Sequence, residues 1–509
     1  MNIYRSDINH ERIFNQLETL ATDMKSVEDS FGNTLENTHI SNRISAVNLI
    51  HYLVLRTAEI RQVQEYLHQI GLSSLTSCES HVLSQLNNVL RWLSPSYVQR
   101  DDIACTFEVA GRIRQEKREL LLGADPYAGR PHIMVTLSSE VANDRMHMEE
   151  ILLAGMTVAR INCAHDNPDV WQQMITTLKK SVAKTGMPCK IYMDLAGPKI
   201  RIKSINYKGE LYEKLKVREQ DKLFLIGTIS ENSNTDEQVI QIEPAEIISM
   251  IKPGEHVFID DGKFEAKVME VSDSRATIQI VRISTKKPFL RIEKGINLPD
   301  SDLSIEALTS TDLSYIPFIC KHADMVGYSF VGTPHDLEKL RNELRKHGTE
   351  NKLPAIILKI ERLSAIQNLP GLLLTGMKDQ RMGVMIARGD LAVEIGFERL
   401  SEIQEEILWI CEAAHVPVIW ATQVLESLNK TGFATRSEMT DAAMGVMAEC
   451  VMLNKGVHMV KTIQVLDNIL RRQIGHVDKK RYIMRPLGIA KNFLDETRLM
   501  EKREPVAQS

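Results

Sequence analysis

The stretch that decides the fold is Ala355-Ile356-Ile357-Leu358-Lys359-Ile360-Glu361-Arg362, which directly follows Pro354. So short and aliphatic a run predicts a strand buried on both faces, the usual state of a strand in a parallel sheet. Lys359 and Glu361 interrupt the apolar pattern, and side chains two positions apart on a strand point to the same face. Buried charges are costly unless a partner or an ion compensates them. The pair is therefore either part of a functional site or a simple ion pair at the rim of the sheet.

Seven further short aliphatic runs alternate with amphipathic helical patterns along the chain. The eight runs, in chain order, are His132–Thr136, Met156–Asn162, Lys190–Asp194, Asp324–Ser329, Ala355–Glu361, Gly383–Ala387, Pro417–Thr422 and Cys450–Asn454. Eight strands that alternate with helices predict an α/β fold, the (β/α)₈ TIM barrel. We expect residues 126–201 and 300–475 to form this catalytic barrel, since together they have the length of one such domain.

Residues 202–299 interrupt the barrel pattern with short strands and turns. The predicted strands are Lys222–Ile226, Gln238–Ile242, His256–Asp260, Phe264–Val271 and Thr277–Ile283. This pattern predicts a small all-β domain. An insertion in a βα loop lies over the carboxyl-terminal mouth of a barrel, where active sites are built, so we expect it to act as a lid.

Residues 1–125 are predicted to form an all-α domain. Apolar residues recur at helical spacing from Ile44 to Ile70, where Gly71 ends the run, and again from Val82 to Leu93. No cluster of residues there suggests chemistry, which favours a role in packing or assembly. The stretch from Gly123 to Pro131 reads as a linker, and residues 476–509 read as a tail.

Composition excludes several classes of function. The 509 residues carry a net charge of -5, which favours neither nucleic acid nor an anionic membrane as a partner. The seven cysteines are scattered without a Cys-x-x-Cys pair, and no apolar run approaches the roughly 20 residues of a membrane span. The polar N-terminus lacks a signal segment. We therefore expect a soluble cytoplasmic protein.

Polar side chains stand at the carboxyl ends of most predicted strands, whereas ordinary loop residues stand at the opposite ends. The strand-end residues are Arg160, Asn162, Asp194, Ser329, Lys359, Glu361, Arg388, Asp390, Thr422 and Gln423. Because barrel active sites are built at this end of the strands, the asymmetry favours the functional interpretation of Lys359 and Glu361.

These residue types suit the chemistry of a charged substrate. Glu361 and Asp390 could hold one Mg²⁺ or Mn²⁺ and leave coordination positions open. Lys359 and Arg160 are cations at the same mouth, as phosphoryl transfer requires, and Thr422 is the hydroxyl placed to relay a proton. Spacing alone predicts a metal-dependent barrel enzyme that acts on a phosphorylated or carboxylated substrate.

The strand-end motifs, in this order, resemble those of the pyruvate kinase family over about residues 130–475. Gly155-Met-Thr-Val-Ala-Arg-Ile-Asn-Cys-Ala-His165 is similar to GMxVARxNxSH, and Met193-Asp-Leu-Ala-Gly-Pro-Lys-Ile-Arg201 to LDTKGPEIR. The other similar segments are Val257–Gly262, Lys294–Pro299, Lys359–Glu361, Val384–Leu391, Ala421–Ser427 and Thr435–Glu438. These match YxDDG, KGVNLP, KIE, IMVARGDL, ATQMLES and TRAE.

The resemblance implies a glycolytic transferase that moves the phosphoryl group of phosphoenolpyruvate to ADP, giving pyruvate and ATP. Glu361 and Asp390 would ligate Mg²⁺ or Mn²⁺, and Lys359 would stabilise the phosphoryl group in transfer. Arg160, Gly389, Asp390 and Thr422 would contact the substrate, with Thr422 on the face where the enolate is protonated. Asn162, His165 and Arg201 would approach the nucleotide phosphates, and Asp261 of the lid would face the mouth on closure.

Three departures from the family's motifs concern its usual K⁺ ion. Ala164 and Leu195 stand where the family has Ser and Thr ligands, and Lys199 replaces the Glu of GPEIR. The replacement of this Glu by Lys is similar to that in family members that work without K⁺. An ammonium group near Asn162 and Asp194 could supply the missing positive charge, so we expect activity that does not require K⁺.

Other departures leave alternatives open. Ser138-Ser139 replaces Gly-Pro in a loop that borders the nucleotide, and Asn454-Lys455-Gly456 replaces Ser-Gly-Glu. The family's further α/β domain, with its effector site and tetramer interface, is not expected after residue 475, so a dimer is favoured over that tetramer. The alternatives are a lyase-like or aldolase-like enzyme acting on a phosphoenolpyruvate- or oxaloacetate-like acid, and a non-catalytic regulator.

Overall fold

The structure is a computed structural model that describes residues 2–99, 103–124, 127, 129–228, 237–272, 275–301, 303, 305–349, 352–479 and 481–482. Part of the predicted linker and nearly all of the predicted tail lie outside the described residues. Of the helices in the described part of the chain, none combines the length and hydrophobicity needed to traverse a bilayer.

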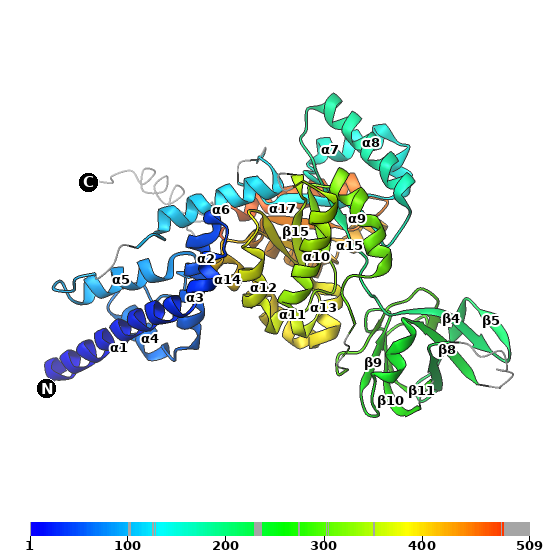
Figure 1. The fold of residues 1–509 in the computed structure, drawn as a ribbon, viewed down its shortest axis with the longest axis horizontal. Helices are drawn as coiled ribbons and strands as arrows, with labels where there is room; N and C mark the ends of the chain where they lie inside the picture. Colours follow the sequence, from blue (N-terminus) through cyan, green and yellow to red (C-terminus); the bar gives the residue numbers. More distant parts are fainter. Residues whose placement is uncertain are drawn as a thin grey trace, which may run out of the picture.

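Eight parallel strands close into a barrel at the centre of the molecule (Figure 1). They are β1 (His132–Thr136), β2 (Val158–Asn162), β3 (Lys190–Asp194), β14 (Met325–Tyr328), β15 (Ala355–Ile360), β16 (Met382–Ala387), β17 (Val418–Ala421) and β18 (Cys450–Leu453). Each pairs with its neighbours in chain order, and β18 pairs with β1 to complete the ring. The predicted (β/α)₈ fold is confirmed, because strands buried on both faces leave an aliphatic pattern that is easily recognised.

Helices surround the barrel on its outer face. They are α7 (Arg145–Ala154), α8 (Pro168–Thr185), α9 (Ser310–His322), α10 (Pro334–His347), α11 (Leu363–Gln367), α12 (Leu369–Gly376), α13 (Arg388–Ile395), α14 (Leu400–Ala413), α15 (Glu426–Thr431), α16 (Arg436–Met444) and α17 (Met459–Gln473). Local sequence sets their starts: α10 begins with Pro334 after Thr333, whose side chain forms a capping box with Asp336.

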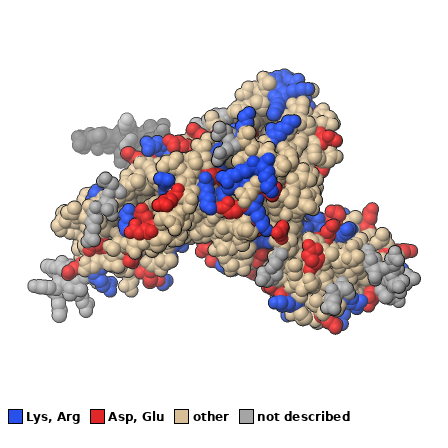
Figure 2. Space-filling model, viewed as in Figure 1, with Lys and Arg blue, Asp and Glu red and all other residues tan. Residues whose placement is uncertain are grey.

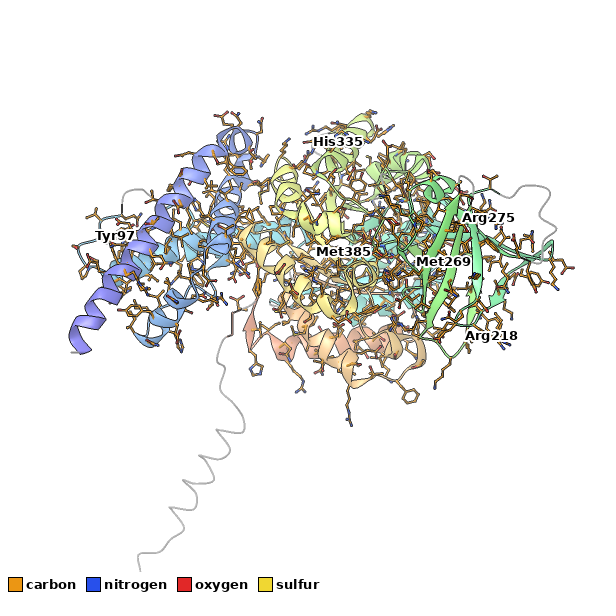
Figure 3. All side chains as sticks on the ribbon, turned by 90° about the horizontal axis from the view of Figure 1, so that it is seen from below. Tyr97, Arg218, Met269, Arg275, His335 and Met385 are labelled. Atoms are coloured by element: carbon orange, nitrogen blue, oxygen red, sulfur yellow. The ribbon has the colours of Figure 1, made fainter. Side chains whose placement is uncertain are left out.

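The N-terminal region is all-helical, as expected. Its helices are α1 (Asn2–Ser30), α2 (Gly32–Glu36), α3 (Arg43–Thr57), α4 (Arg61–Gln69), α5 (Val82–Leu93) and α6 (Phe107–Leu122). The periodic pattern that runs from Ile44 to Ile70 is divided between α3 and α4, because Ala58 adopts an extended conformation. This region packs on the barrel at the end opposite the lid, so that helical region, barrel and lid lie in a row (Figures 1 and 3).

Polar side chains of α3 make the contact with the barrel. Asn48 is buried and donates hydrogen bonds to the carbonyl oxygens of Glu79 and Ala413, at 2.7 and 2.8 Å. Ser45 lies 3.0 Å from Nδ1 of His415, which follows α14. An apolar periodicity cannot reveal this face, because Ser45 and Asn48 are polar and find their hydrogen-bond partners only in the folded structure.

The last turn of α6 closes the amino-terminal end of the barrel. Leu121 and Leu122 are buried in a cluster with residues inside the barrel, such as Met134 and Ile357. Gly383 of β16 leaves room for this contact, since a Cβ there would lie 2.9 Å from a methyl group of Leu121. The helical region thus contributes directly to the core of the barrel.

The inserted segment forms its own β structure with a separate apolar core. Its strands are β4 (Arg201–Tyr207), β5 (Glu210–Tyr212), β6 (Lys214–Lys216), β7 (Lys222–Ile226), β8 (Gln238–Glu243), β9 (His256–Ile259), β10 (Phe264–Ser272), β11 (Arg275–Ile283), β12 (Phe289–Arg291) and β13 (Ile296–Asn297). Eight of them form one sheet in the order β13-β9-β10-β11-β7-β8-β4-β5. The lid stands apart from the barrel body at the opposite end from α1 (Figure 1).

We expect Leu121→Ala to lower the free energy of unfolding by about 2–5 kcal/mol, because it removes apolar contacts inside the closed end of the barrel. Urea denaturation measures the loss. The matched control is Leu120→Ala, since the neighbouring Leu120 is 41 % exposed and its truncation costs about 0.5 kcal/mol or less. Equal losses in the two variants would contradict the packing of α6 in the barrel.

Candidate active site

Lys359 lies at the centre of the barrel mouth and is buried. Its Nζ atom is 3.0 Å from Oε1 of Glu361 and 3.3 Å from Oδ1 of Asp194, and it donates a 2.5 Å hydrogen bond to Oγ of Ser329. Burial alone would lower the pKa of Lys359, but the two carboxylates outweigh it and the pKa is raised. The ammonium group therefore stays charged at neutral pH.

Asp194, at the end of β3, joins Lys359 to the second cation of the mouth. Its Oδ2 atom accepts from Nη2 and Nε of Arg160, at 2.5 and 3.0 Å, while Nη1 of Arg160 donates to Thr136. The hydroxyl of Tyr192 donates to the other carboxylate oxygen at 3.0 Å. Burial would raise the pKa of Asp194, but Lys359 and Arg160 outweigh it and the pKa is lowered. Sequence reasoning missed Tyr192, which an apolar strand pattern hides.

Glu361 directly follows β15, and Asp390 lies in the first turn of α13, which follows the neighbouring strand β16. Glu361 is buried, and its Oε2 atom accepts a 2.7 Å hydrogen bond from the backbone N–H of Phe330. Burial raises the pKa of Glu361, Lys359 opposes the rise, and the negative charge of Asp390 adds to it. Each carboxylate thus acts on the other through its charge.

These carboxylates fit a hard divalent cation. Glu361 is buried and Asp390 is partly buried, and burial together with the charge of Asp390 raises the pKa of Glu361. A cation bound by both carboxylates would relieve this repulsion, and Mg²⁺ and Mn²⁺ prefer oxygen ligands. Among the described residues, no group of three or more His, Cys, Asp or Glu side chains converges as a closed metal site. Oxygens of substrate and water would complete the coordination of an ion held by Glu361 and Asp390.

Lys199 reaches the site from the loop after β3. Its Nζ atom is 2.8 Å from Oδ1 of Asp390. Burial would raise the pKa of Asp390, but Lys199 outweighs it, and the amide of Asn297 in the lid also lowers this pKa. The stem of Lys199 lies against Gly295, where a Cβ would approach to 2.8 Å. Lys199, which we expected near Asn162 and Asp194, is thus paired with Asp390, a candidate metal ligand.

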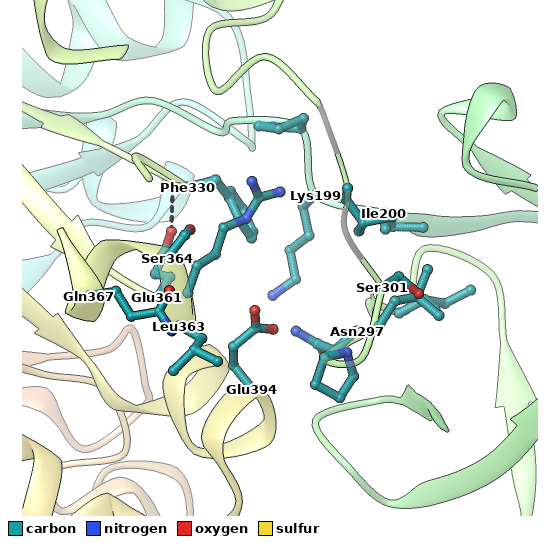
Figure 4. Close-up of a pocket in the computed structure, with 16 residues that line it drawn as sticks. Lys199, Ile200, Asn297, Ser301, Phe330, Glu361, Leu363, Ser364, Gln367 and Glu394 are labelled. Carbon is teal, nitrogen blue, oxygen red and sulfur yellow. Dashed lines mark hydrogen bonds between the residues drawn. The ribbon is translucent and has the colours of Figure 1, made fainter. Parts of the chain in front are cut away.

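A cavity of about 200 Å³ adjoins this pair between the barrel and the base of the lid. Figure 4 shows Lys199 and Asn297 pointing into it toward Glu394 of α13, with the hydrogen bond from Phe330 to Glu361 at its wall. Burial raises the pKa of Glu394, and Arg362 only partly opposes the rise. Sequence analysis did not single out Asn297 or Glu394, although Asn297 lies within the Lys294–Pro299 motif.

Thr422 occupies a strained turn after β17. Its φ is 65°, and Gln423 and Leu425 follow with φ of 56° and 48°. A β-branched residue in this region is an outlier of the kind that clusters at functional sites. The backbone N–H of Gly389 donates to Oγ1 of Thr422 at 2.8 Å, and Nη2 of Arg388 donates to its carbonyl oxygen at 2.6 Å. The turn is therefore fixed beside Asp390.

Two of the three residues expected near a nucleotide, Asn162 and His165, line one cavity, whereas Arg201 is not among its lining residues. Asn162, His165 and Arg160 border a cavity of about 250 Å³ together with Lys455. Partial burial, then Lys455 and Arg201, lower the pKa of His165. Nη1 of Arg201 donates to the carbonyl oxygen of Glu293, a contact that holds it within the lid.

The unusual loop residues lie together around a neighbouring cavity of about 440 Å³. Ser138, Ser139, Lys455 and Gly456 line it, and Lys455 also borders the cavity beside His165. Asn454 borders the cavity beside His165 and accepts a hydrogen bond from Asn429 at its carbonyl oxygen. Asp261 is exposed on the lid, where the adjoining Gly262 lies close to Phe397.

Comparison with known proteins bears on the same part of the chain. Residues 128–458 match the family described as "Pyruvate kinase, barrel domain". The chain is 31 % identical over 331 residues to a protein named "Pyruvate kinase" of Thermotoga maritima, which covers 64 % of this chain and 67 % of that protein. It is 30 % identical over 351 residues to one of Candida albicans (67 % and 66 %) and 33 % identical over 313 residues to one of Hypocrea jecorina (59 % and 54 %). The chain thus spans about two thirds or less of the length of these relatives.

We expect Asp194→Asn to lower the free energy of unfolding by about 3–5 kcal/mol at pH 7, because it leaves two buried cations without their shared carboxylate. The folded-state pKa of Asp194 lies below its unfolded value, so its contribution is complete above that value and is lost as the pH falls through the folded pKa. Urea denaturation at pH 7 measures the effect. Asp166→Asn, at an exposed position of the same rim, is the control; a comparably small loss for Asp194→Asn would argue against the buried network.

Proposed function

Since the chain belongs to the pyruvate kinase family, we propose that it transfers the phosphoryl group of phosphoenolpyruvate to ADP, in the glycolytic direction and in the cytoplasm. The bond between phosphorus and the enol oxygen breaks, and a bond to a terminal oxygen of ADP forms. The enolate then takes a proton at its methylene carbon and becomes pyruvate. The observation that carries the proposal is the buried ammonium of Lys359, which lies 3.0 Å from Glu361 at the mouth of the barrel.

Lys359 and Arg160 are proposed to neutralise the phosphoryl group during its transfer. Phosphoryl transfer depends on positioning and on stabilisation of charge, more than on covalent chemistry by the protein. Asp194 contacts both cations, so it fixes their separation before a substrate arrives. A donor that is already oriented needs no reorganisation during the reaction, which is the main source of such electrostatic stabilisation.

Glu361 and Asp390 are proposed to hold Mg²⁺ or Mn²⁺. Bound there, the cation would neutralise charge on phosphoryl and carboxylate oxygens of the substrate. Burial and the negative charge of Asp390 raise the pKa of Glu361, so a cation bound by both carboxylates would relieve their repulsion.

Thr422 is proposed to deliver the proton to the enolate. Its hydroxyl oxygen accepts the N–H of Gly389, so its own hydrogen is left for a second partner. Gly389 and Asp390 stand at the start of α13, where a side chain at Gly389 would contact Thr422 at 3.6 Å. The absence of a side chain there keeps the space between Thr422 and the metal ligands open to a substrate.

Asn162, His165 and Arg201 are proposed to bind the phosphates of ADP or ATP. The cavity beside His165 and the cavity along Ser138 and Ser139 adjoin, since both are lined by Lys455, and this supports a nucleotide that contacts both. The altered residues of these loops also support a second candidate. A lyase-like or aldolase-like reaction on a phosphoenolpyruvate- or oxaloacetate-like acid would use the metal and Lys359 without a nucleotide.

Lys199 is proposed to replace the usual K⁺ ion. Its ammonium group lies 2.8 Å from Asp390, and a tethered cation has no need to be bound from solution. When Glu361 and Asp390 hold a divalent cation, Lys199 would release Asp390 and supply positive charge beside the substrate.

We expect the purified chain to release pyruvate from phosphoenolpyruvate with Mg²⁺ only when ADP is present, and to do so in K⁺-free buffer. Lys199→Met should lower this K⁺-free turnover by roughly tenfold or more, since it removes a charge-assisted contact at the site. The control is Lys203→Met, an exposed lysine of β4. Turnover without ADP would favour the lyase-like candidate, and a steep rise with K⁺ in the unmodified chain would contradict the role of Lys199.

We expect Lys359→Met to reduce kcat by roughly a hundredfold or more with little change in KM, because its charge acts mainly in the transition state. Steady-state kinetics with saturating ADP and Mg²⁺ provide both constants, and circular dichroism monitors folding. Lys352→Met, at an exposed position before β15, is the matched control. A proportionate loss of substrate binding and of stability would instead indicate that Lys359 only maintains the buried ion cluster.

A further inference from the structure

A cavity of about 530 Å³ lies at the end of the barrel opposite the mouth. The second half of α10, the start of β15, the loop between α12 and β16, and the helical region all contribute to it. Its lining residues are His39, Leu120, Arg341, Leu344, Arg345, Leu353, Pro354, Ala355, Ile356, Lys378, Asp379, Gln380 and Arg381. It is separate from the candidate active site, because β15 and β16 begin beside it, whereas Lys359 lies near the other end of β15 and Asp390 follows the other end of β16.

The wall of this cavity is strongly basic. Arg341, Arg345, Lys378 and Arg381 face Asp379 alone among the charged lining residues that the structure describes, which leaves an excess of three positive charges. Figure 2 shows Lys and Arg side chains gathered in the middle of the visible face, over the region where Figure 1 places α10 and β15. The chain as a whole is acidic, with a net charge of -5, so this concentration of cations is local.

Two of the four cations are already committed to protein partners. Nε of Arg341 lies 2.8 Å from Asp379, its Nη1 lies 2.7 Å from Glu338, and its Nη2 donates to the carbonyl oxygen of Thr375. Lys378 is 2.7 Å from the same Glu338. These contacts hold Arg341 and Lys378 against carboxylates and a carbonyl group of the protein.

The other two cations keep donors available. Arg345 is half exposed, and its contact with Asp379 is long, at 3.9 Å. Arg381 donates from Nη2 to the carbonyl oxygen of Leu353 at 2.6 Å, and among the described residues no carboxylate pairs with it. A guanidinium carries five N–H donors, so both side chains can still bind an anion in bidentate fashion.

Helix geometry alone does not account for this cluster. Basic residues commonly occupy the last turn of a helix, where they interact favourably with the helix dipole, and Arg345 stands there in α10. Arg381 and Lys378, however, come from the loop before β16. Helix α10 and the loop before β16 therefore both bring cations to this cavity. These cations repel one another, and a bound anion would remove that repulsion.

The loop that carries Arg381 is held in place by the helical region. Nδ2 of Asn42 donates to the carbonyl oxygens of Met377 and Asp379, at 3.2 and 2.7 Å, and the backbone N–H of His39 donates to Met377 at 3.0 Å. Such contacts keep the cavity preformed, which lowers the entropic cost of binding a ligand.

We propose that this cavity binds a small phosphorylated anion at a site distinct from the substrates, with Arg345 and Arg381 as its phosphate ligands. Planar guanidinium groups match the geometry of phosphate oxygens, and charge-assisted bidentate contacts are the strong ones. The volume lies in the range of sites that take small molecules. The site does not depend on the reaction proposed for the barrel mouth.

Inorganic pyrophosphate is the probe, and isothermal titration of the full chain in the absence of divalent metal is the measurement. The double variant Arg345→Gln/Arg381→Gln should bind pyrophosphate at least roughly tenfold more weakly than the unmodified chain at this site. The barrel mouth is the same in both proteins, so the difference between the two isotherms reports on the basic cavity. Thermal melting checks that the variant is folded, and pyruvate release should be unchanged.

The matched control is Lys339→Gln/Lys346→Gln, which removes two positive charges from the same helix. These lysines pair with Glu306 and Glu343 and do not line the cavity. Unchanged affinity in the control, with loss in the arginine variant, would support the site. Equal weakening in both double variants would show that pyrophosphate responds only to the overall positive charge of this surface. Identical isotherms for all three proteins would show that pyrophosphate does not bind in the cavity. Either result overturns the proposal.

Discussion

The buried charge of Lys359 is the constraint on which the mouth of the barrel depends. An ammonium group in this position is tolerated only because Asp194 and Glu361 lie within 3.3 Å of it and Ser329 accepts its hydrogen bond. These partners lie at the ends of β3, β14 and β15, so these three neighbouring strands must pair before the charge is compensated.

The same arrangement explains why the site can accept a metal and a phosphoryl group. Glu361 and Asp390 place two carboxylates side by side, while Lys359, Arg160 and Lys199 supply positive charge around them. In the structure, Nζ of Lys199 lies 2.8 Å from Oδ1 of Asp390. An ammonium on a flexible stem can leave when a stronger cation arrives, whereas a fixed ion pair deep in the barrel cannot.

The two ends of the barrel have different tasks. At the amino-terminal end, α6 inserts Leu121 into the barrel core, and Asn42 and Asn48 bind backbone carbonyl groups of the barrel loops. Polar groups at this contact are satisfied by the partner rather than by water, which fixes the position of the helical region. The basic cavity lies along this contact, so a ligand there would meet elements from both parts of the molecule.

The sequence by itself determined the barrel, the inserted β domain, the helical region and the strand-end residues. A strand buried on both faces must be aliphatic, and a charge at its end is conspicuous, so both signals are local. Only the tertiary structure decided which charges meet. Nothing in the spacing of Lys199 and Asp390 reveals their contact, because 190 intervening residues and an entire inserted domain lie between them. Asn297, Tyr192 and the polar face of α3 were hidden for the same physical reason: a buried polar group is stabilised by partners that only folding brings near.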